Sequence, residues 1–240
     1  MDNKGGGESR ASLPSVHPEG RKFALICFGF ALIAAVLAWE TIAWPLAFLS
    51  LCILAFFRDP ERVVPRGEDL ILSPADGTVT QIVTVDPPLE LQDQDGGMGS
   101  GPVTRVSIYL SLFDVHINRS PCAGTIGRMS YIPGAFVNAS LDKSSEENER
   151  QHLLVVRGDG VVVGFTQIAG IIARRIVPFV KPGDIVAAGQ RVGLIRFGSR
   201  VDIYLPSGTS PQVLMGQRVI AGETVIGRLG QSVALEGLQQ

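Results

Sequence analysis

Cysteine, histidine and excess charge of either sign are all scarce in this sequence, and each shortage excludes a class of protein. The 21 basic and 23 acidic side chains give a net charge of −2, and the pI is near 5.9, so the charge gives no sign of nucleic-acid binding. Only three cysteines occur, Cys27, Cys52 and Cys122. An odd number without a sensible pairing argues against a disulfide scaffold and indicates a reducing compartment.

The three histidines, His17, His116 and His152, stand at unrelated positions. Zinc sites gather several Cys or His ligands at short spacings, and the sequence has no His-x-His pair. We therefore predict no metal, and a cell-wall metallopeptidase with a related β fold is disfavoured because it needs paired zinc histidines. Aromatic residues are few and glycine is abundant, at 28 residues, which is typical of a turn-rich β protein.

Two apolar segments lie near the N-terminus. Residues 1–20 are rich in Gly, Ser and Pro and are predicted to form a disordered tail. Residues 23–39 and 42–57 are almost wholly apolar, and each is slightly short for a spanning helix, which needs about 20 residues. No convincing cleavage site of small residues precedes Glu40, which argues against a secretory signal peptide.

Basic residues flank this apolar pair on both outer sides. Arg21 and Lys22 precede it, and Arg58, Arg62 and Arg66 follow it. By the positive-inside rule both flanks then belong on the cytoplasmic side. The sequence predicts a helical hairpin over residues 21–60 that dips into or across the inner membrane, with the rest of the chain on the cytoplasmic face. A buried soluble hairpin is the alternative.

From residue 61 to residue 240 short apolar runs alternate with turn signals such as Asp-Gly. Two of these segments, 180–193 and 213–227, share a spacing of Gly and Val that is typical of the hairpins in biotinyl and lipoyl carrier domains. We therefore expect residues 61–240 to form a mainly β domain, an antiparallel barrel-sandwich hybrid, behind the N-terminal helical hairpin. A membrane-tethered carrier module is one alternative function, but the lysine at the hairpin tip is missing, since Lys181 precedes Pro-Gly.

The pair Gly198-Ser199 stands between two strand-like runs, 191–194 and 201–205. Its plain interpretation is a β-bulge. Its chemical interpretation is that the Ser199 hydroxyl attacks the preceding carbonyl, which the bare Gly198 leaves open. The resulting ester would eliminate, break the chain and leave a dehydroalanine, whose hydrolysis gives a pyruvoyl group. Serine is a weak nucleophile without a base, so this chemistry needs a histidine nearby.

His116 is the best candidate for that base. It follows a predicted strand, in a polar cluster with Asp114 and Arg119. A histidine is partly neutral near pH 7, so it can take the proton of Ser199. Either Asp76 or Asp114 could orient the imidazole as the carboxylate does in a Ser-His-Asp triad, and the spacing does not choose between them.

These motifs together resemble the phosphatidylserine decarboxylase proenzymes in their short bacterial and archaeal form. The resemblance spans residues 23 to about 205, and it is the ordered set of motifs that is specific. The matching pieces are Ser73-Pro-Ala-Asp-Gly-Thr-Val79, Tyr109-Leu-Ser-Leu-Phe-Asp-Val-His116 with Pro121 after it, Asn148-Glu-Arg150, and Phe197-Gly-Ser199.

The resemblance implies self-cleavage between Gly198 and Ser199 into a large chain, 1–198, and a small chain, 199–240, that begins with the pyruvoyl group. It also implies a charge relay of Asp76, His116 and Ser199.

The activity it implies is pyruvoyl-dependent decarboxylation of phosphatidylserine to phosphatidylethanolamine and carbon dioxide, in which the ketone condenses with the substrate amine and accepts electrons. His116 would later return a proton to carbon. Arg119 and Phe197 are the expected substrate-binding residues. The expected partners are the phospholipid, the membrane and further copies of the chain in a homo-oligomer. Archaetidylserine is an alternative substrate, because it carries the same reacting headgroup.

Two positions depart from the long form of the family. Arg200 follows Ser199 where many long-form members have threonine, and Arg119 stands where they have a second histidine. His116 must then do alone any work that two histidines share elsewhere.

Overall fold

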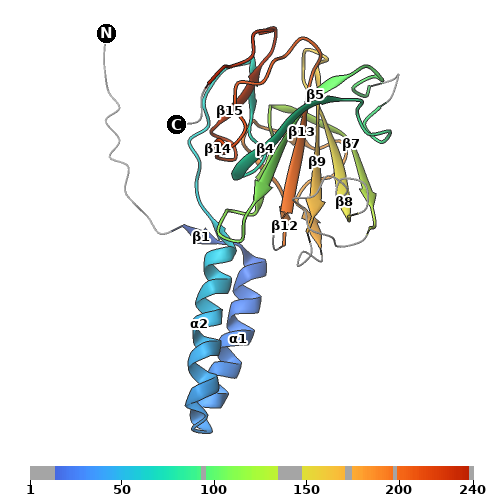
Figure 1. Cartoon of the computed structure of the whole chain (residues 1–240). Coiled ribbons are helices and arrows are strands. Elements are labelled where there is room, and N and C mark those ends of the chain that lie inside the picture. Colours follow the sequence, from blue (N-terminus) through green and yellow to red (C-terminus); the bar gives the residue numbers. More distant parts are fainter. Residues whose placement is uncertain (1–13, 93–95, 135–147, 171–174, 197–198, 238–240) are drawn as a thin grey trace, which may run out of the picture. The chain divides into compact units, whose positions relative to one another are not determined.

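The computed structural model describes residues 14–92, 96–134, 148–170, 175–196 and 199–237 (Figure 1). The chain divides into two compact units, Met1–Glu61 and Arg62–Gln240.

The first unit is a pair of helices, α1 (Pro18–Val36) and α2 (Glu40–Phe56), which lie side by side (Figure 1). Two short strands, β1 (Ser15–Val16) and β2 (Arg58–Asp59), pair antiparallel beside them. The predicted tail is therefore too long, because residues 15–20 have regular structure; residues 1–13 lie outside the described residues. The helix begins early because Pro18 suits the first helical position and the Nδ1 atom of His17 accepts a hydrogen bond from the Glu19 amide at 3.3 Å.

Small side chains fill the contact between the two helices. The Ser50 hydroxyl donates to the Ala24 carbonyl at 3.0 Å, and the Cys27 thiol donates to the Leu46 carbonyl at 3.3 Å. The buried residues of α1 are all small: Gly20, Ala24, Cys27, Ala31 and Ala34. Among the described residues no helix has both the length and the apolar character needed to cross a membrane.

The second unit is built of antiparallel strands, which confirms the prediction of a mainly β fold. Its strands are β3 (Leu70–Leu72), β4 (Gly77–Val85), β5 (Val103–Leu110), β6 (Ile117–Arg119), β7 (Gly124–Ile132), β8 (Arg150–Val156), β9 (Val162–Ala169), β10 (Ile176–Pro178), β11 (Ile185–Val186), β12 (Arg191–Ile195), β13 (Ser199–Leu205), β14 (Arg218–Val219) and β15 (Val225–Arg228). The large sheet has the order β11-β7-β8-β9-β13-β5-β4-β14. Two smaller sheets have the orders β10-β12-β6 and β15-β3.

Strand β13 lies inside the large sheet, between β5 and β9. Its alternating pattern places Val201 and Ile203 in the main core, together with Ile195 from the three-stranded sheet. The intervening residues, Arg200 and Asp202, face the other side of the sheet and are also buried. Both faces of this strand are thus fixed by packing.

The two similar segments, 180–193 and 213–227, occupy equivalent places. Each puts its first strand on an edge of the large sheet, β11 on one edge and β14 on the other, and its second strand in a smaller sheet. The expectation that each forms a paired hairpin is therefore wrong: its two strands join different sheets. Their turns meet, since a Cβ atom built on Gly222 would lie 3.3 Å from the Cα atom of Gly189. Both glycines have positive φ, 76° and 71°, which a turn of this kind requires.

Candidate active site

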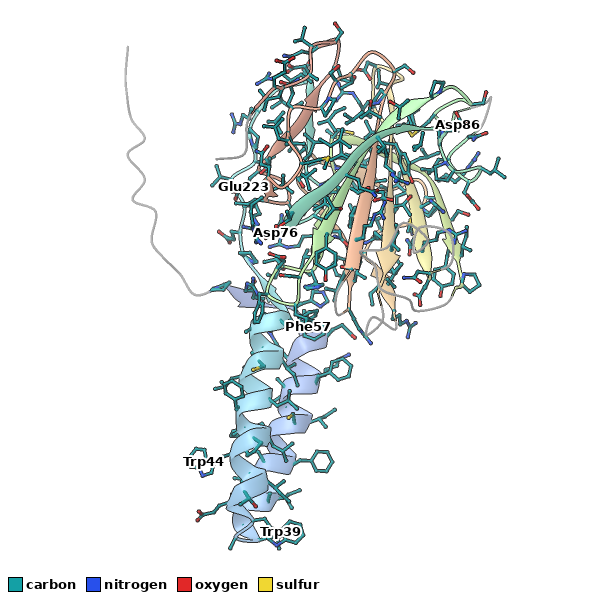
Figure 2. All side chains as sticks on the ribbon, viewed as in Figure 1. Trp39, Trp44, Phe57, Asp76, Asp86 and Glu223 are labelled. Atoms are coloured by element: carbon teal, nitrogen blue, oxygen red, sulfur yellow. The ribbon has the colours of Figure 1, made fainter. Side chains whose placement is uncertain are left out.

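Three of the strands that form the large sheet bring predicted site residues to the same end. Ser199 opens β13 and pairs with the last residue of β5, Leu110, and the last residue of β9, Ala169. Asp76 directly precedes β4, which is the next strand beyond β5; it lies at one end of β4, and Asp86 follows the other end (Figure 2). Two strand spacings, about 10 Å, separate β13 from β4.

The side chain of Ser199 is an exception to the rule that buried polar atoms find partners. The residue is fully buried, and its Oγ atom has no hydrogen-bond partner among the residues that the structure describes. The strand pairs in unbroken register from Ser199 onward. The predicted bulge at Gly198 lies outside the described residues, as does Phe197.

His116 lies in the segment that follows β5 and is fully buried. Its Nδ1 atom is 3.0 Å from the main-chain carbonyl oxygen of Asp114. A carbonyl oxygen only accepts, so Nδ1 carries the proton and the neutral ring has its lone pair on Nε2. A main-chain carbonyl is thus one partner that orients the ring, through Nδ1, and the role of a carboxylate in orienting it stays a prediction.

The carboxylate of Asp114 is engaged in the turn after β5. One oxygen accepts hydrogen bonds from the amide of Ser111 at 2.8 Å and from its hydroxyl at 2.7 Å, and the other pairs with Arg218. Burial alone would raise the pKa of Asp114, but these hydrogen bonds and the Arg218 charge outweigh it and hold the pKa below its ordinary value. The side chain therefore shapes the segment that presents His116.

Two contacts help to fix Asp76 at the start of β4. It accepts a hydrogen bond from the Ala221 amide at 2.8 Å and forms an ion pair with Arg62 at 2.7 Å. The next residue, Gly77, passes so close to β5 that an added Cβ atom would lie 2.1 Å from the Tyr109 carbonyl oxygen. Only glycine permits this approach, which explains the Asp-Gly pair at this point.

Arg119 has a different setting from the one expected. It lies in β6 and is buried, and its guanidinium donates to the Gly189 carbonyl at 2.8 Å. An added Cβ atom on Gly222 would lie 3.1 Å from its Cδ atom. These contacts place the side chain at the junction of the two similar turns, so they support the fold there; its role in binding substrate stays a prediction.

The motif Asn148-Glu-Arg150 lies beside the partner strand of Ser199. The Asn148 side-chain amide donates to the Ala169 main-chain carbonyl at 2.7 Å. The Ala169 main-chain amide donates to the Glu149 main-chain carbonyl at 2.9 Å. The motif thus holds the end of β9 against which Ser199 pairs. The sequence alone gives no indication of this contact, because it joins the motif to the end of a strand, 21 residues after Asn148.

Arg200, which departs from the long-form family pattern, is buried beside Asp202 in β13. Its guanidinium is 2% exposed and binds the Asp202 carboxylate through two hydrogen bonds, of 2.6 and 3.1 Å. It also donates to the Ser107 hydroxyl at 2.9 Å. The sequence carries a sign of this buried ion pair, because Arg200 and Asp202 are opposite charges two residues apart, which places them on the same face of an apolar strand.

The other histidine of this unit, His152, is buried in β8 and hydrogen bonds through Nδ1 with the Thr166 hydroxyl at 2.8 Å. Burial lowers its pKa to about 4, with Glu90 opposing the shift and Arg150 adding to it. The ring is therefore neutral at physiological pH and serves the packing between β8 and β9.

Comparison with known proteins identifies the family. A family model described as phosphatidylserine decarboxylase matches residues 49–227. A phosphatidylserine decarboxylase proenzyme from Novosphingobium aromaticivorans is 67% identical over 100% of this chain and 97% of its own length. Proenzymes of the same name from Erythrobacter litoralis and Zymomonas mobilis are 63% and 57% identical, over 100% and 96% of this chain and 98% and 94% of their own lengths. The chain therefore belongs to the phosphatidylserine decarboxylase family.

Proposed function

We propose that this chain is a proenzyme that cleaves itself between Gly198 and Ser199 and then decarboxylates phosphatidylserine to phosphatidylethanolamine and carbon dioxide. The observation that carries the proposal is the buried Ser199 hydroxyl, which has no partner among the described residues. It stands where the segment bearing His116 leaves the sheet. A buried polar group without a partner costs folding free energy, so its presence here indicates a functional role.

The position of Ser199 fits a pyruvoyl group. The conversion removes the hydroxyl and the amide nitrogen of Ser199, so the unpaired polar atom is lost, while the rest of β13 stays paired with β5 and β9. Once formed, the pyruvoyl ketone supplies the acceptor for the substrate amine and for the electrons released with carbon dioxide.

Maturation begins with a proton transfer. The Nε2 lone pair of His116 takes the Ser199 proton as Oγ forms a bond to the Gly198 carbonyl carbon, and the Asp114 carbonyl stabilises the charged ring. The Gly198–Ser199 C–N bond then breaks and the freed amine takes a proton, which gives an ester. Loss of the Ser199 α-proton breaks the Cβ–Oγ bond and leaves a Gly198 carboxylate. Water then replaces the nitrogen, which leaves as ammonia.

During turnover, His116 in its protonated form returns a proton to the substrate carbon that has lost carbon dioxide. Asp76, held by Arg62 and Ala221 at the end of the large sheet where Ser199 lies, is the carboxylate that the family resemblance assigns to the charge relay. The small chain stays in place after cleavage because β13 is hydrogen bonded on both sides.

The helical pair is proposed to attach the enzyme to the cytoplasmic face of the inner membrane. Large apolar side chains are exposed along both helices, among them Phe28, Phe30, Trp44 and Phe48. Such a surface suits contact with lipid, and the small residues between the helices are typical of packing in a bilayer. The substrate is itself a membrane lipid, so the enzyme would act without releasing it. A homo-oligomer of barrel-sandwich-hybrid subunits remains the expected assembly.

The activity is tested by supplying phosphatidylserine in mixed micelles to the purified full chain and measuring carbon dioxide and phosphatidylethanolamine. We expect equal amounts of both, and we expect reduction of the enzyme's carbonyl group with borohydride to abolish their formation. Turnover that survives complete reduction would contradict the pyruvoyl mechanism.

A further inference from the structure

The three-stranded sheet brings two arginines to the same end as His116. Its order is β10-β12-β6, and at one end stand Arg175, just before β10, Arg196, just after β12, and His116, just before β6. The Arg196 amide donates to the Arg175 carbonyl at 3.4 Å, and the Ile195 amide donates to the His116 carbonyl at 3.2 Å. Two positively charged residues and the proposed base therefore occupy neighbouring strands at a single edge.

A cavity of about 430 Å³ lies beside Arg175, within the second unit. It is bounded by β7, β8 and β10 through Met129, Tyr131, Glu149, Gln151, Arg175, Ile176 and Pro178. Arg175 is exposed, and its guanidinium has no hydrogen-bond or ion-pair partner among the described residues.

The one carboxylate in the cavity wall is already engaged. Glu149 is buried and accepts a hydrogen bond from the Ile176 amide at 3.1 Å. Burial and this carboxylate together raise the pKa of Tyr131 above its ordinary value. The Arg175 charge opposes this shift, so Arg175 lies near the Tyr131 hydroxyl at the cavity wall, while Glu149 is held by its own neighbours.

The cavity lies within reach of Ser199. Glu149, which lines it, accepts a hydrogen bond from the Ala169 amide, and Ala169 pairs with Ser199, so two strand spacings, about 10 Å, separate Glu149 from Ser199. Arg196 does not line the cavity, but its amide donates to the carbonyl of Arg175, which does, and its Cα atom is at most about 11 Å from that of Ser199, three residues later. A substrate whose amine reacts at Ser199 can therefore place an anionic group, a few bonds from that amine, in this cavity.

We propose that Arg175, assisted by Arg196, binds the phosphodiester of the substrate headgroup in this cavity. The inference rests on the proposed function and names its headgroup site. It gives the phosphate to Arg175, whereas Arg119 is engaged with the Gly189 carbonyl. Arginine suits a phosphate because its planar guanidinium makes paired, charge-assisted hydrogen bonds.

The substrate carboxylate is the other anion in the headgroup, but it is a poor choice of ligand. It disappears in the reaction, so an arginine bound to it would stabilise the reactant and lose that interaction in the transition state. The phosphodiester persists in the product, and holding it orients the headgroup without opposing the chemistry.

The test is the double variant Arg175→Gln with Arg196→Gln, beside Arg191→Gln, a matched control at the opposite end of β12. All three proteins, wild type included, should cleave fully and bind phenylhydrazine at the pyruvoyl carbonyl to the same extent. For phosphatidylserine, kcat/KM should fall about 10- to 100-fold in the double variant, as expected for lost charge-assisted hydrogen bonds, and stay unchanged in the control.

A second assay separates the two anions of the headgroup. Glycerophosphoethanolamine carries the phosphodiester and no carboxylate, so its inhibition constant should rise in the double variant by the same factor. An unchanged inhibition constant would assign the arginines to the carboxylate and overturn the proposal, as would an unchanged kcat/KM.

Failure of the wild type to cleave would instead refute the proposed function. If the double variant fails to mature, Arg175→Gln alone decides, because Arg175 is exposed and its guanidinium makes no hydrogen bond or ion pair with the described residues. This single variant should cleave fully and show the same two changes in reduced size. Wild-type values in it would overturn the proposal.

Discussion

Replacing Arg200 with methionine should destabilise the second unit strongly. The Arg200 side chain is 2% exposed and the Asp202 side chain is fully buried, and the two hydrogen bonds between them measure 2.6 and 3.1 Å. Without the guanidinium, Asp202 keeps a buried charge whose next cation, Arg105, is 3.9 Å away. Breaking one side of a buried pair costs about 3–5 kcal/mol. For a chain of this size that corresponds to a fall in Tm of about 6–20 °C.

Calorimetry of the uncleaved Ser199→Ala background is the suitable assay. Both tryptophans, Trp39 and Trp44, belong to the first unit, so tryptophan fluorescence would miss the unfolding of the β-rich unit. Single-chain protein also removes any contribution from separation of the two cleaved chains.

The matched control is Arg228→Met. Arg228 pairs with Asp69 at 3.0 Å, but the two side chains are 48% and 49% exposed, so the loss should be at most about 1 kcal/mol. Adding Asp202→Leu to Arg200→Met should recover much of the stability, because no unpaired charge remains. Equal shifts for Arg200→Met and Arg228→Met would refute the reasoning.

Three further outcomes are expected. His116→Ala should stay uncleaved, and chemical modification of histidine in mature His152→Ala protein should stop turnover while the pyruvoyl group still traps an amine; an unchanged rate would limit His116 to maturation. The low pKa of His152, about 4 against an ordinary 6.5, means that the unfolded state binds a proton that the folded state does not. Stability by urea titration should therefore fall by about 3 kcal/mol as the pH drops from 6.5 to 4, and this slope should vanish in His152→Gln. Fusion reporters at residue 10 and at the C-terminus should both report the cytoplasm, and opposite sides would exclude the hairpin.

The sequence could predict features that depend on local pattern. Short apolar runs between turn signals predicted a mainly β unit over residues 61–240, and the strands confirm it. The two apolar runs largely coincide with α1 and α2, whose place in a membrane stays a prediction. The order of the family motifs also implied a charge relay of Asp76, His116 and Ser199, which stays a prediction. The structure places Asp76 and Ser199 at one end of the large sheet, and His116 in the segment that follows β5.

The remaining features depend on contacts between distant segments. Nothing in residues 180–193 indicates that β11 and β12 join different sheets, because the partners of β11 and β12 lie elsewhere in the chain. A main-chain carbonyl has no sequence signature, so the orientation of His116 through Asp114 was out of reach. Arg119 and Arg175 look equally able to bind an anion until Gly189 is seen to engage the first.

The central claim is that Ser199 becomes the first group of a separate chain, and the intact mass of the purified protein tests it most directly. We predict two chains, 1–198 and 199–240, with the smaller one lighter by one ammonia than the serine peptide and lacking a free N-terminal amine. Ser199→Ala should give a single chain of full length. A single chain in the wild type, or two chains in Ser199→Ala, would contradict the account.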